Sequence, residues 1–356
     1  MKKIHINFMS FGFFGSEPVI SRIIKEMQKI KGLKLSFFGL DEPRPMIQGP
    51  ENEIKISFHY ARFKKNRILR RIEYIKNILK RKNNSLPEKN LICYFPGCSF
   101  LAILLNKPIL ILTSFTVSKS RFRRVIMDNL IRFESLFFYK VIVFSKGMRS
   151  KLLIKKSQLI QLGASYYVTN MKKMEEPNFL YIGTLFNRNI LDCVAGFHDY
   201  LNDNGKGILH IICNGDRAEA NIIENYISTN LLQSKVKFYY ESSHPHKSEI
   251  FNLCEVGISY IPITKYYDIQ PATKTFEYLL NGMFVIATKT TENQRFITKK
   301  NGILIDDSRQ AIKSAFSSYS EIRHKVSRSE IKARHSALSW SKIMSDNIFH
   351  FLEHES

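Results

Sequence analysis

A lysine and a glutamate three residues apart follow a proline in the second half of the chain, in the sequence Pro271-Ala272-Thr273-Lys274-Thr275-Phe276-Glu277. Proline suits the first turn of a helix, so a short helix is expected to begin within a residue or two of Lys274, with Thr273 or Thr275 as its N-cap. A helix N-terminus presents free N–H groups to an anion. Lys274 adds a positive charge there, and the Glu277 carboxylate can accept hydrogen bonds from sugar hydroxyls. These residue types in this order predict a nucleotide-sugar site.

The predicted helix lies between two apolar runs that are typical of buried strands, 256–261 and 284–287. Gly282 stands where such a helix would end. The order strand, loop, helix, strand is the unit of parallel α/β sheets, whose ligands bind beyond the carboxyl ends of the strands. The loop before Lys274 is therefore expected at that edge of a sheet.

The same alternation of strand-like and helix-like segments runs through the whole chain. It extends from residue 4 to residue 162 and resumes at residue 179, after a polar stretch. A chain of 356 residues has room for two domains. We therefore expect an α/β protein with two Rossmann-like, doubly wound sheets, the first in a domain at 1–165, followed by a linker at 166–177.

Charge is distributed unevenly between the two halves. The formal net charge is +23. Residues 1–174 contain 34 Lys and Arg against 10 Asp and Glu, a balance of +24, whereas residues 175–356 contain 20 against 21, a balance of −1. A strongly basic half favours an anionic membrane surface or a nucleic acid as its partner.

Two basic amphipathic helices contribute to this charge. The helix predicted at 62–82 has ten Lys and Arg against Glu73, and its apolar stripe is Ile68, Ile72, Ile75 and Leu79. The helix predicted at 121–138 has a stripe of Phe122, Ile126, Leu130, Phe133 and Phe137. Buried faces explain most amphipathic helices, so we expect both stripes to pack on a sheet.

Packing does not explain why the charge is one-sided, and a surface that rests on anionic lipid is the sharper interpretation. The expected membrane-binding residues are Arg70, Arg71, Lys80 and Arg81. No nucleic acid is expected as a partner, because the basic residues form no recognisable binding motif and the neighbouring aromatic residues fall on the apolar stripe.

Three further features are interpreted as structural. Residues 4–9 are expected to form a first strand rather than a signal peptide, because Glu17 follows and no small-residue cleavage site is present. Prolines and polar residues interrupt 91–112, which predicts two buried strands around a helix rather than a membrane span. The five cysteines form no CxxC pair, so we expect buried free thiols in a reducing cytoplasm rather than metal ligands.

Three motifs of the second half resemble the donor domain of GT-B glycosyltransferases, and glycosyltransferase family 4 most of all. They are Tyr181-Ile182-Gly183-Thr184-Leu185 followed by Arg188, Cys213-Asn214-Gly215-Asp216, and P-x-x-K-x-x-E from Pro271 to Glu277. The first half is similar only in layout. The resemblance implies two domains that face a cleft and a retaining transfer from a nucleotide diphospho-sugar, with no essential metal and no other cofactor.

The resemblance also implies roles for individual residues. Arg188 and Lys274 would stabilise the diphosphate leaving group, where fixed cations are needed, and Glu277 would bind the ribose hydroxyls. Gly12 and Gly15, in the loop after the first strand, would lie near the diphosphate. The remaining expected donor contacts are Gly183, Thr184, Asn214, Tyr240, Ile269, Gln270, Pro271 and Thr273.

Two positions depart from the family pattern. The acidic residue usual eight positions before the ribose-binding glutamate is Ile269 here, and the adjacent Asp268 is the alternative source of a carboxylate. The Arg or Lys usual just after the first donor-domain glycine is Thr184. Both departures concern the sugar and phosphate end of the site rather than its ribose end.

The resemblance implies that the basic domain at 1–165 binds the acceptor and that residues 178–325 form the donor domain. Such enzymes end with a helix that crosses back to the first domain, which implies returning helices at 326–356. The expected reaction moves a sugar to a lipid-linked or other saccharide acceptor in surface polysaccharide assembly. It would take place in the cytoplasm, at the inner membrane face. The alternative is a non-catalytic nucleotide- or nucleic-acid-binding protein on the same fold, and Ile269 is its best support.

Overall fold

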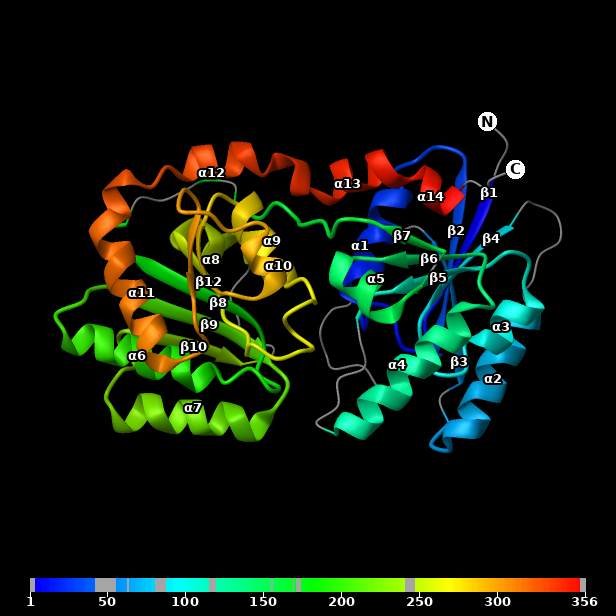
Figure 1. Cartoon of the computed structure of the whole chain (residues 1–356), viewed down its shortest axis with the longest axis horizontal. Coiled ribbons are helices and arrows are strands. Elements are labelled where there is room, and N and C mark those ends of the chain that lie inside the picture. The colour runs from blue at the N-terminus through cyan, green and yellow to red at the C-terminus, as the bar shows by residue number, and fades with distance from the viewer. Residues whose placement is uncertain are drawn as a thin grey trace. The chain divides into compact units, whose positions relative to one another are not determined.

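The computed structural model describes residues 4–41, 56–62, 64–80, 88–114, 120–154, 156–168, 170, 174–240 and 247–352. The chain divides into two compact units, and each contains one parallel sheet covered by helices (Figure 1). The first unit comprises Met1–Leu162 and Trp340–Ser356, and the second comprises Gly163–Ser339. The prediction of an α/β chain with two doubly wound sheets is confirmed.

The first unit is built on a seven-stranded sheet with the order β3-β2-β1-β4-β5-β6-β7. All its strand pairs are parallel. Residues of the central strands are buried on both faces, as expected for strands between two helix layers. The strands are β1 (Ile4–Met9), β2 (Leu33–Asp41), β3 (Ser57–Arg62), β4 (Glu88–Cys93), β5 (Ile109–Leu112), β6 (Lys140–Val143) and β7 (Ser157–Leu159).

Helices cover both faces of this sheet. They are α1 (Pro18–Met27), α2 (Arg67–Lys80), α3 (Ser99–Leu104), α4 (Arg121–Ser135), α5 (Lys146–Leu152) and, from the C-terminus, α13 (Trp340–Asn347) and α14 (Phe349–Leu352). Right-handed crossovers place α1 on one face and α2 to α5 on the other, because the chain adds strands in opposite directions before and after β3. The strand order therefore reverses between β1 and β4, which is the point where ligands of such sheets bind.

The edge strand β3 was missed by the sequence interpretation, and it shortens the predicted helix at 62–82. The strand extends to Arg62, and α2 begins only at Arg67. Asn66 sets this start, since its Oδ1 accepts hydrogen bonds from the backbone N–H groups of Ile68 (2.9 Å) and Leu69 (3.2 Å). The helix ends at Lys80, and Arg81 lies outside the described residues.

The apolar stripe of α2 faces solvent, so the prediction that it packs on the sheet is wrong. Ile68 is 71% exposed, and Ile72 and Leu79 are also exposed. The buried residues of α2 are Tyr74 and Ile78, about a third of a turn around the helix axis from the stripe. Tyr74 can be buried because its hydroxyl donates to the Phe38 carbonyl at 3.1 Å and its ring packs on Phe11 and Phe95.

The stripe predicted for α4 is exposed as well, with Phe122 at 74% and Phe133 at 58%. The helix instead turns Glu134 inward. Its buried carboxylate accepts hydrogen bonds from Gly97 N–H (2.8 Å), Ser99 Oγ (2.9 Å) and the Tyr94 hydroxyl (3.0 Å). A buried carboxylate needs such donors, and this network fixes the start of α3 on α4.

The second unit is built on a six-stranded parallel sheet with the order β10-β9-β8-β11-β12-β13. The strands are β8 (Asn178–Thr184), β9 (Ile208–Asn214), β10 (Val236–Tyr240), β11 (Val256–Ser259), β12 (Phe284–Thr288) and β13 (Gly302–Ile305). The helices are α6 (Ile190–Asn202), α7 (Arg217–Thr229), α8 (Lys247–Leu253), α9 (Thr273–Leu280), α10 (Thr291–Gln294), α11 (Arg309–Ile322) and α12 (Arg328–Arg334), with 3₁₀ turns at Arg323–Lys325 and Ser336–Leu338.

In this unit the strand order reverses between β8 and β11. α6 and α7 lie on one face of the sheet, with α11 packed on α6, whereas α8, α9 and α10 lie on the other (Figure 1). The loop after β8 and the loop between β11 and α9 both start at the carboxyl ends of these neighbouring strands. The elements that contain Arg188 and Lys274 are therefore positioned at the switch point.

The second unit also includes residues 163–177 and 326–339, which the sequence interpretation assigned to the first domain, the linker and the returning helices. Arg323 donates to the carbonyls of Met174 and Glu175 (both 2.6 Å), and α12 packs on α9. Only the chain from Trp340 onward belongs to the first unit, where α13 contacts α1 and α14 contacts β4. This tail consists of the two helices α13 and α14.

All five cysteines are buried and free, as expected. The segment 91–112 contains β4, α3 and β5, which confirms two strands around a helix. Over the described ranges, none of the helices combines the length and the apolar character needed to span a bilayer.

Candidate functional site at the β8/β11 switch point

Arg188 lies in the loop after β8, between two asparagines with left-handed backbone conformations. Asn187 has a φ of 54° and Asn189 a φ of 53°, which asparagine tolerates better than most residues. The Arg188 guanidinium stacks on Tyr267, with Cζ 4.1 Å from the ring centroid. Its Nη1 atom is buried and has no hydrogen-bond partner among the described residues. A buried guanidinium N–H without an acceptor is a donor available to an anion.

Lys274 lies in the first turn of α9, which begins where the sequence predicted it. The predicted N-caps are wrong, because Ala272 occupies the N-cap and no side chain caps the helix. Thr275 is buried and its hydroxyl instead donates to Asn293 Oδ1 (2.9 Å) and is hydrogen-bonded to Ser259 Oγ (2.7 Å). The first N–H groups of α9 are thus left without a side-chain acceptor.

The Lys274 ammonium lies against the end of β8. Its Nζ is 3.9 Å from the centroid of the Tyr181 ring, and a Cβ atom at Gly183 would lie 3.0 Å from the same nitrogen. Glycine is therefore needed at position 183 for the lysine to approach the strand so closely. Nζ donates no hydrogen bond within the described part of the chain. Burial, followed by the nearby Arg188 charge, lowers the pKa of Lys274 well below its ordinary value.

Gln270 presents a third group without a partner. Its Oε1 atom is buried and accepts no hydrogen bond from the described residues. Its backbone N–H donates to the carbonyl of Tyr267, the residue on which Arg188 stacks, at 3.4 Å. Gln270 and Arg188 thus flank the same tyrosine. Ile269 precedes Gln270 in the same loop, and the buried Pro271 follows Gln270.

Glu277 is half-buried one turn beyond Lys274 and is held from outside the helix. Its Oε1 accepts a hydrogen bond from the Tyr167 hydroxyl at 3.2 Å, across 110 residues of sequence. The Tyr167 ring packs on Phe251. No local pattern points to Tyr167, which sequence reasoning missed together with Tyr267.

Asn281, fully buried at the end of α9, fixes the segment that contains Tyr167. Its Oδ1 accepts hydrogen bonds from the backbone N–H groups of Tyr167 (2.7 Å) and Val168 (3.0 Å), and its Nδ2 donates to the Ser165 carbonyl (2.9 Å). Asn281 Nδ2 also donates to the Glu277 carbonyl at 2.7 Å, so these bonds together with the Tyr167–Glu277 bond set the position of the Tyr167 hydroxyl relative to Glu277.

Asp268 does not supply the carboxylate that Ile269 lacks. Its two oxygens accept hydrogen bonds from the backbone N–H and the hydroxyl of Thr291, both at 2.8 Å, at the start of α10. This carboxylate is already used to cap a helix. The side chains assembled around α9 therefore contain two cations, one unpartnered amide oxygen and Glu277.

The other predicted donor residues lie along the same edge of the sheet. Thr184 and Asn214 end β8 and β9, where Leu185 N–H donates to the Asn214 carbonyl at 2.9 Å. Tyr240 ends β10, donates to the Gly215 carbonyl at 2.8 Å and is covered by Arg217. Thr273 is exposed in the first turn of α9.

The predicted residues of the first unit lie in the loop after β1. The Gly12 carbonyl accepts from Leu40 N–H at 2.9 Å, and Gly15 has a φ of 103°, which favours glycine. Of the predicted membrane-binding residues, Arg71 and Lys80 are exposed, whereas Arg70 is half-buried and donates through Nε to the Lys64 carbonyl at 2.7 Å.

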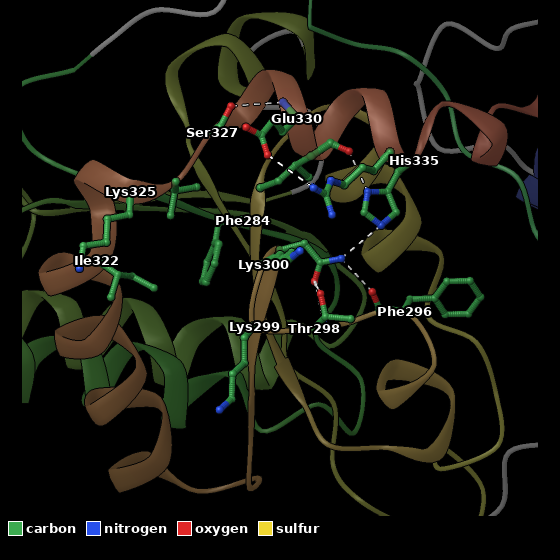
Figure 2. A pocket seen from close by; sticks show the side chains of 14 residues that line it. Phe284, Phe296, Thr298, Lys299, Lys300, Ile322, Lys325, Ser327, Glu330 and His335 are labelled. Atoms are coloured by element: carbon green, nitrogen blue, oxygen red, sulfur yellow. Dashed lines mark hydrogen bonds and ion pairs between the residues drawn. The ribbon is translucent and has the colours of Figure 1, made fainter.

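A separate cavity of about 610 Å³ lies between α12 and the loop before β13 (Figure 2). Its floor includes Phe284 and Ile331, and Lys299, Lys300 and Lys325 line it. His335 and Asn301 form a hydrogen bond of 3.2 Å in its wall, and Figure 2 shows Lys299 pointing away from this pair. None of the predicted site residues lines this cavity.

No protein-family model and no curated protein matches the sequence. Solved structures do match over nearly the whole chain. Sucrose-phosphate synthase from Thermosynechococcus elongatus has a TM-score of 0.74 at 14% identity, covering 98% of both chains. HepE from Anabaena, in complex with UDP and glucose, has a TM-score of 0.72 at 13% identity, covering 99% of this chain and 100% of its own.

The lipopolysaccharide outer core galactosyltransferase WaaB has a TM-score of 0.64 at 16% identity, covering 98% of this chain and 99% of its own. Identities this low demonstrate a shared fold and not a shared activity. Together with the strand orders of the two sheets, these matches show that the chain has the GT-B fold of glycosyltransferases.

Proposed function

We propose that this protein is a glycosyltransferase that binds a nucleotide diphospho-sugar at the β8/β11 switch point. The observation that carries the proposal is the set of groups without a hydrogen-bond partner in the described residues: Arg188 Nη1, Gln270 Oε1 and Lys274 Nζ, which contacts the face of the Tyr181 ring. A diphosphate would accept hydrogen bonds from both cations, and a donor hydroxyl would bond to the amide oxygen. HepE, whose fold is similar, was solved with UDP and glucose.

In the proposed reaction the bond between the anomeric carbon and the phosphate oxygen breaks, and the acceptor hydroxyl oxygen bonds to that carbon on the same face, with retention of configuration. The hydroxyl proton passes to the departing diphosphate. Negative charge develops on the departing diphosphate, and Arg188 and Lys274 stabilise it. We propose that these two cations and the N-terminus of α9 stabilise the diphosphate charge without a divalent metal. Glu277, oriented by Tyr167, would accept hydrogen bonds from the ribose hydroxyls.

A screen of nucleotide sugars for nucleotide release, followed by isothermal titration with UDP and GDP, tests this function. We expect one diphosphate to bind and Glu277→Ala to weaken it. Binding without release from any donor, with saccharide acceptors present, would support the alternative of a non-catalytic nucleotide-binding protein. The anomeric proton of the product, observed by NMR, distinguishes retention from inversion.

We further propose that the acceptor is lipid-linked and that α2, α3 and α4 rest on an anionic bilayer. These helices expose an apolar surface, which we call the α2–α4 surface: Ile68, Leu69, Ile72 and Leu79 of α2, Phe100, Ile103 and Leu104 of α3, and Phe122, Val125, Ile126 and Phe133 of α4. Arg67, Arg71, Lys76 and Lys80 of α2 form no ion pair with the described residues. Large apolar patches rimmed by cations fit a lipid surface.

The occupant that we propose is lipid rather than another protein, because of charge complementarity. The half that contains the α2–α4 surface has a balance of +24, which an anionic leaflet attracts at about 1 kcal/mol per well-placed Lys or Arg. The exposed phenylalanine and isoleucine side chains would strengthen binding by inserting at the boundary between lipid headgroups and acyl chains. With a lipid-linked acceptor, the biological role that we propose is surface polysaccharide assembly.

Flotation with phosphatidylglycerol-containing and pure phosphatidylcholine vesicles tests this surface. Phe122→Asp and Ile68→Asp are each expected to reduce flotation on anionic vesicles, and Arg71→Glu/Lys80→Glu is expected to remove the preference for anionic lipid. Leu231→Asp, at a residue 82% exposed on the second unit, is the matched control. Equal flotation of all variants would contradict a lipid-binding role for the α2–α4 surface. Tighter binding to duplex DNA than to vesicles would favour a nucleic acid as the partner of this surface.

A further inference from the structure

The cavity between α12 and the loop before β13 lies at the edge of the sheet opposite the β8/β11 site. Phe284 begins β12 and Asn301 directly precedes β13, so the cavity is at the amino ends of these strands. All residues that line it belong to the second unit. Its volume of about 610 Å³ is in the range of small-molecule sites. The cavity therefore has the size of a ligand site and lies apart from the donor site.

Positive charge dominates the rim of this cavity. Four cations line it against one carboxylate, although the second half of the chain has a balance of −1. Lys299 and Lys300 come from the loop before β13, and Lys325 comes from the 3₁₀ turn after α11 (Figure 2). These three lysines form no ion pair with a described residue. The fourth cation, Arg334, has an exposed contact of 3.7 Å with Glu330, and such a pair contributes little, so the rim is available to an anion.

The floor of the cavity is apolar and only partly covered. Phe284 and Ile331 are buried at its base. Phe296, Ile322 and Val326 are half-buried, so each retains apolar surface that a ligand would cover. The rim and the floor together suit a molecule with an anionic end and an apolar body.

Hydrogen bonds hold the loop that contains two of these lysines. Asn301 is buried, its Oδ1 accepts from Thr298 N–H at 2.7 Å, and its Nδ2 donates to the Phe296 carbonyl at 2.9 Å. His335 Nδ1 lies 2.7 Å from a backbone carbonyl of α12, which can only accept, so Nδ1 carries a proton. Its Nε2 accepts from Asn301 Nδ2 at 3.2 Å. The loop is thus tied to the end of α12 before any ligand binds, which lowers the entropic cost of binding.

The start of α12, which forms the other wall, is fixed as well. Arg328 donates through Nε to the Gly282 carbonyl and through Nη2 to the Phe251 carbonyl, both at 3.3 Å. Ser327 caps the helix, since its Oγ accepts from Glu330 N–H at 3.3 Å. Both walls of the cavity are therefore preformed.

We infer that this cavity binds a small organic phosphate, with the phosphate at the cationic rim and an apolar or aromatic body on the floor. A phosphate monoester carries about 1.5 to 2 negative charges at neutral pH, which matches the rim better than the single charge of a carboxylate. Inorganic phosphate would leave the floor uncovered, and a neutral aromatic molecule would leave the cations unpaired. The inference goes beyond the proposed function and does not depend on it, because the cavity shares no residue with the donor site.

Saturation-transfer NMR titration with phenyl phosphate, with and without saturating UDP, tests this inference. The wild-type protein is expected to bind the probe saturably, and Lys299→Ala/Lys300→Ala to bind it about tenfold more weakly, because charge-assisted contacts are lost. Val326→Trp, which fills the cavity without changing its charge, is expected to abolish binding. Lys289→Ala is the matched control, since it removes an exposed lysine that follows β12, at the other edge of the same sheet.

Phenol and inorganic phosphate test the floor and the rim separately. Phenol is expected to bind about tenfold or more weakly than phenyl phosphate, and inorganic phosphate to displace phenyl phosphate only at about tenfold higher concentration. Equal affinity for inorganic phosphate would mean that the lysines attract any anion and that the floor takes no part. Equal affinity for phenol would mean that the rim takes no part. Either result would overturn the inference.

The remaining outcomes distinguish this cavity from the donor site. Lys299→Ala/Lys300→Ala alters only exposed side chains and is expected to unfold at the wild-type temperature, so unchanged affinity in this variant would overturn the inference. Absence of saturable binding to the wild type would do the same. Displacement of phenyl phosphate by UDP, or its loss in Lys274→Ala, would assign the probe to the donor site. A wild type that binds phenyl phosphate at the cavity but no nucleotide diphosphate would contradict the proposed function alone.

Discussion

The strand order reverses once in each sheet, and the side chains at the two reversals have opposite charge. At the β8/β11 point of the second unit, Arg188 and Lys274 have N–H groups that find no acceptor among the described residues. At the β1/β4 point of the first unit, Glu17 has a carboxylate oxygen to which none of the described residues donates. The formal net charges of the two halves have signs opposite to those of their switch points: +24 for residues 1–174 and −1 for residues 175–356.

This contrast teaches that net charge and site charge serve different purposes. The excess of Lys and Arg on α2 is on the surface, where it acts at long range on a large anionic partner. The switch points are partly desolvated, so a few side chains there decide which ligand each one accepts. Burial favours the neutral form of both titratable groups, since it lowers the pKa of Lys274 and raises that of Glu17.

The largest effect on turnover is expected when the positive charge of Lys274 is removed. Lys274→Ala is expected to reduce turnover by about 10²–10³-fold, because it removes charge stabilisation of the leaving group. Lys289→Ala, which breaks an exposed ion pair with Asp306, is the control and should retain activity. The measurement is nucleotide release at saturating donor. Turnover of Lys274→Ala within twofold of the control would show that the cationic switch point is not the reaction site.

A pH series tests how strongly the donor site lowers the pKa of Lys274. The pKa of Lys274 is lowered in the free protein, and a bound diphosphate raises it again, so binding takes up a proton at pH values between the two. Affinity should therefore fall as pH rises through that window, by up to about tenfold per pH unit. Titration calorimetry in two buffers of different ionisation enthalpy measures the uptake. Lys274→Ala should lose it, and a wild type with no uptake would contradict a lowered pKa of Lys274 in the free protein.

The ribose end of the donor site gives the next largest effect. Tyr167→Phe removes the hydroxyl that holds Glu277 and is expected to weaken diphosphate binding about fivefold. The loss should vanish for the 2′,3′-dideoxy nucleotide, and it should also vanish in a Glu277→Ala background. Calorimetry on the four proteins measures this cycle. An equal loss for both nucleotides would mean that Tyr167 acts on the fold rather than on ribose binding.

The smallest expected effect comes from crowding Lys274. In Gly183→Ala the new methyl would lie 3.0 Å from Lys274 Nζ and 3.2 Å from the Tyr181 hydroxyl. The end of a lysine can move by a few tenths of an ångström, so turnover should fall only roughly threefold. The same substitution in Lys274→Ala should cost less, and what remains measures the strain of an alanine at a φ of 156°. A similar loss in both backgrounds would point to backbone strain at residue 183 instead.

Much of the fold and part of the donor site were predictable from sequence. The first strand, Ile4–Met9, was predicted residue for residue, and the first turn of α9 lies where Pro271 indicated it. Local signals were sufficient there, since apolar runs, prolines and glycines act on their own neighbours. The edge strand β3 was missed because its half-buried residues show no clear pattern.

The sequence by itself determined the α/β alternation, the uneven charge, and the spacing of Lys274 and Glu277. Only the tertiary structure decided which face of α2 and α4 is buried, because periodicity locates an apolar stripe without naming what covers it. The tertiary structure also decided three hydrogen bonds: Thr291 to Asp268, Tyr167 to Glu277, and Thr113 to Glu17. The last two contacts link residues about a hundred positions apart, and no local preference of the chain encodes such a contact.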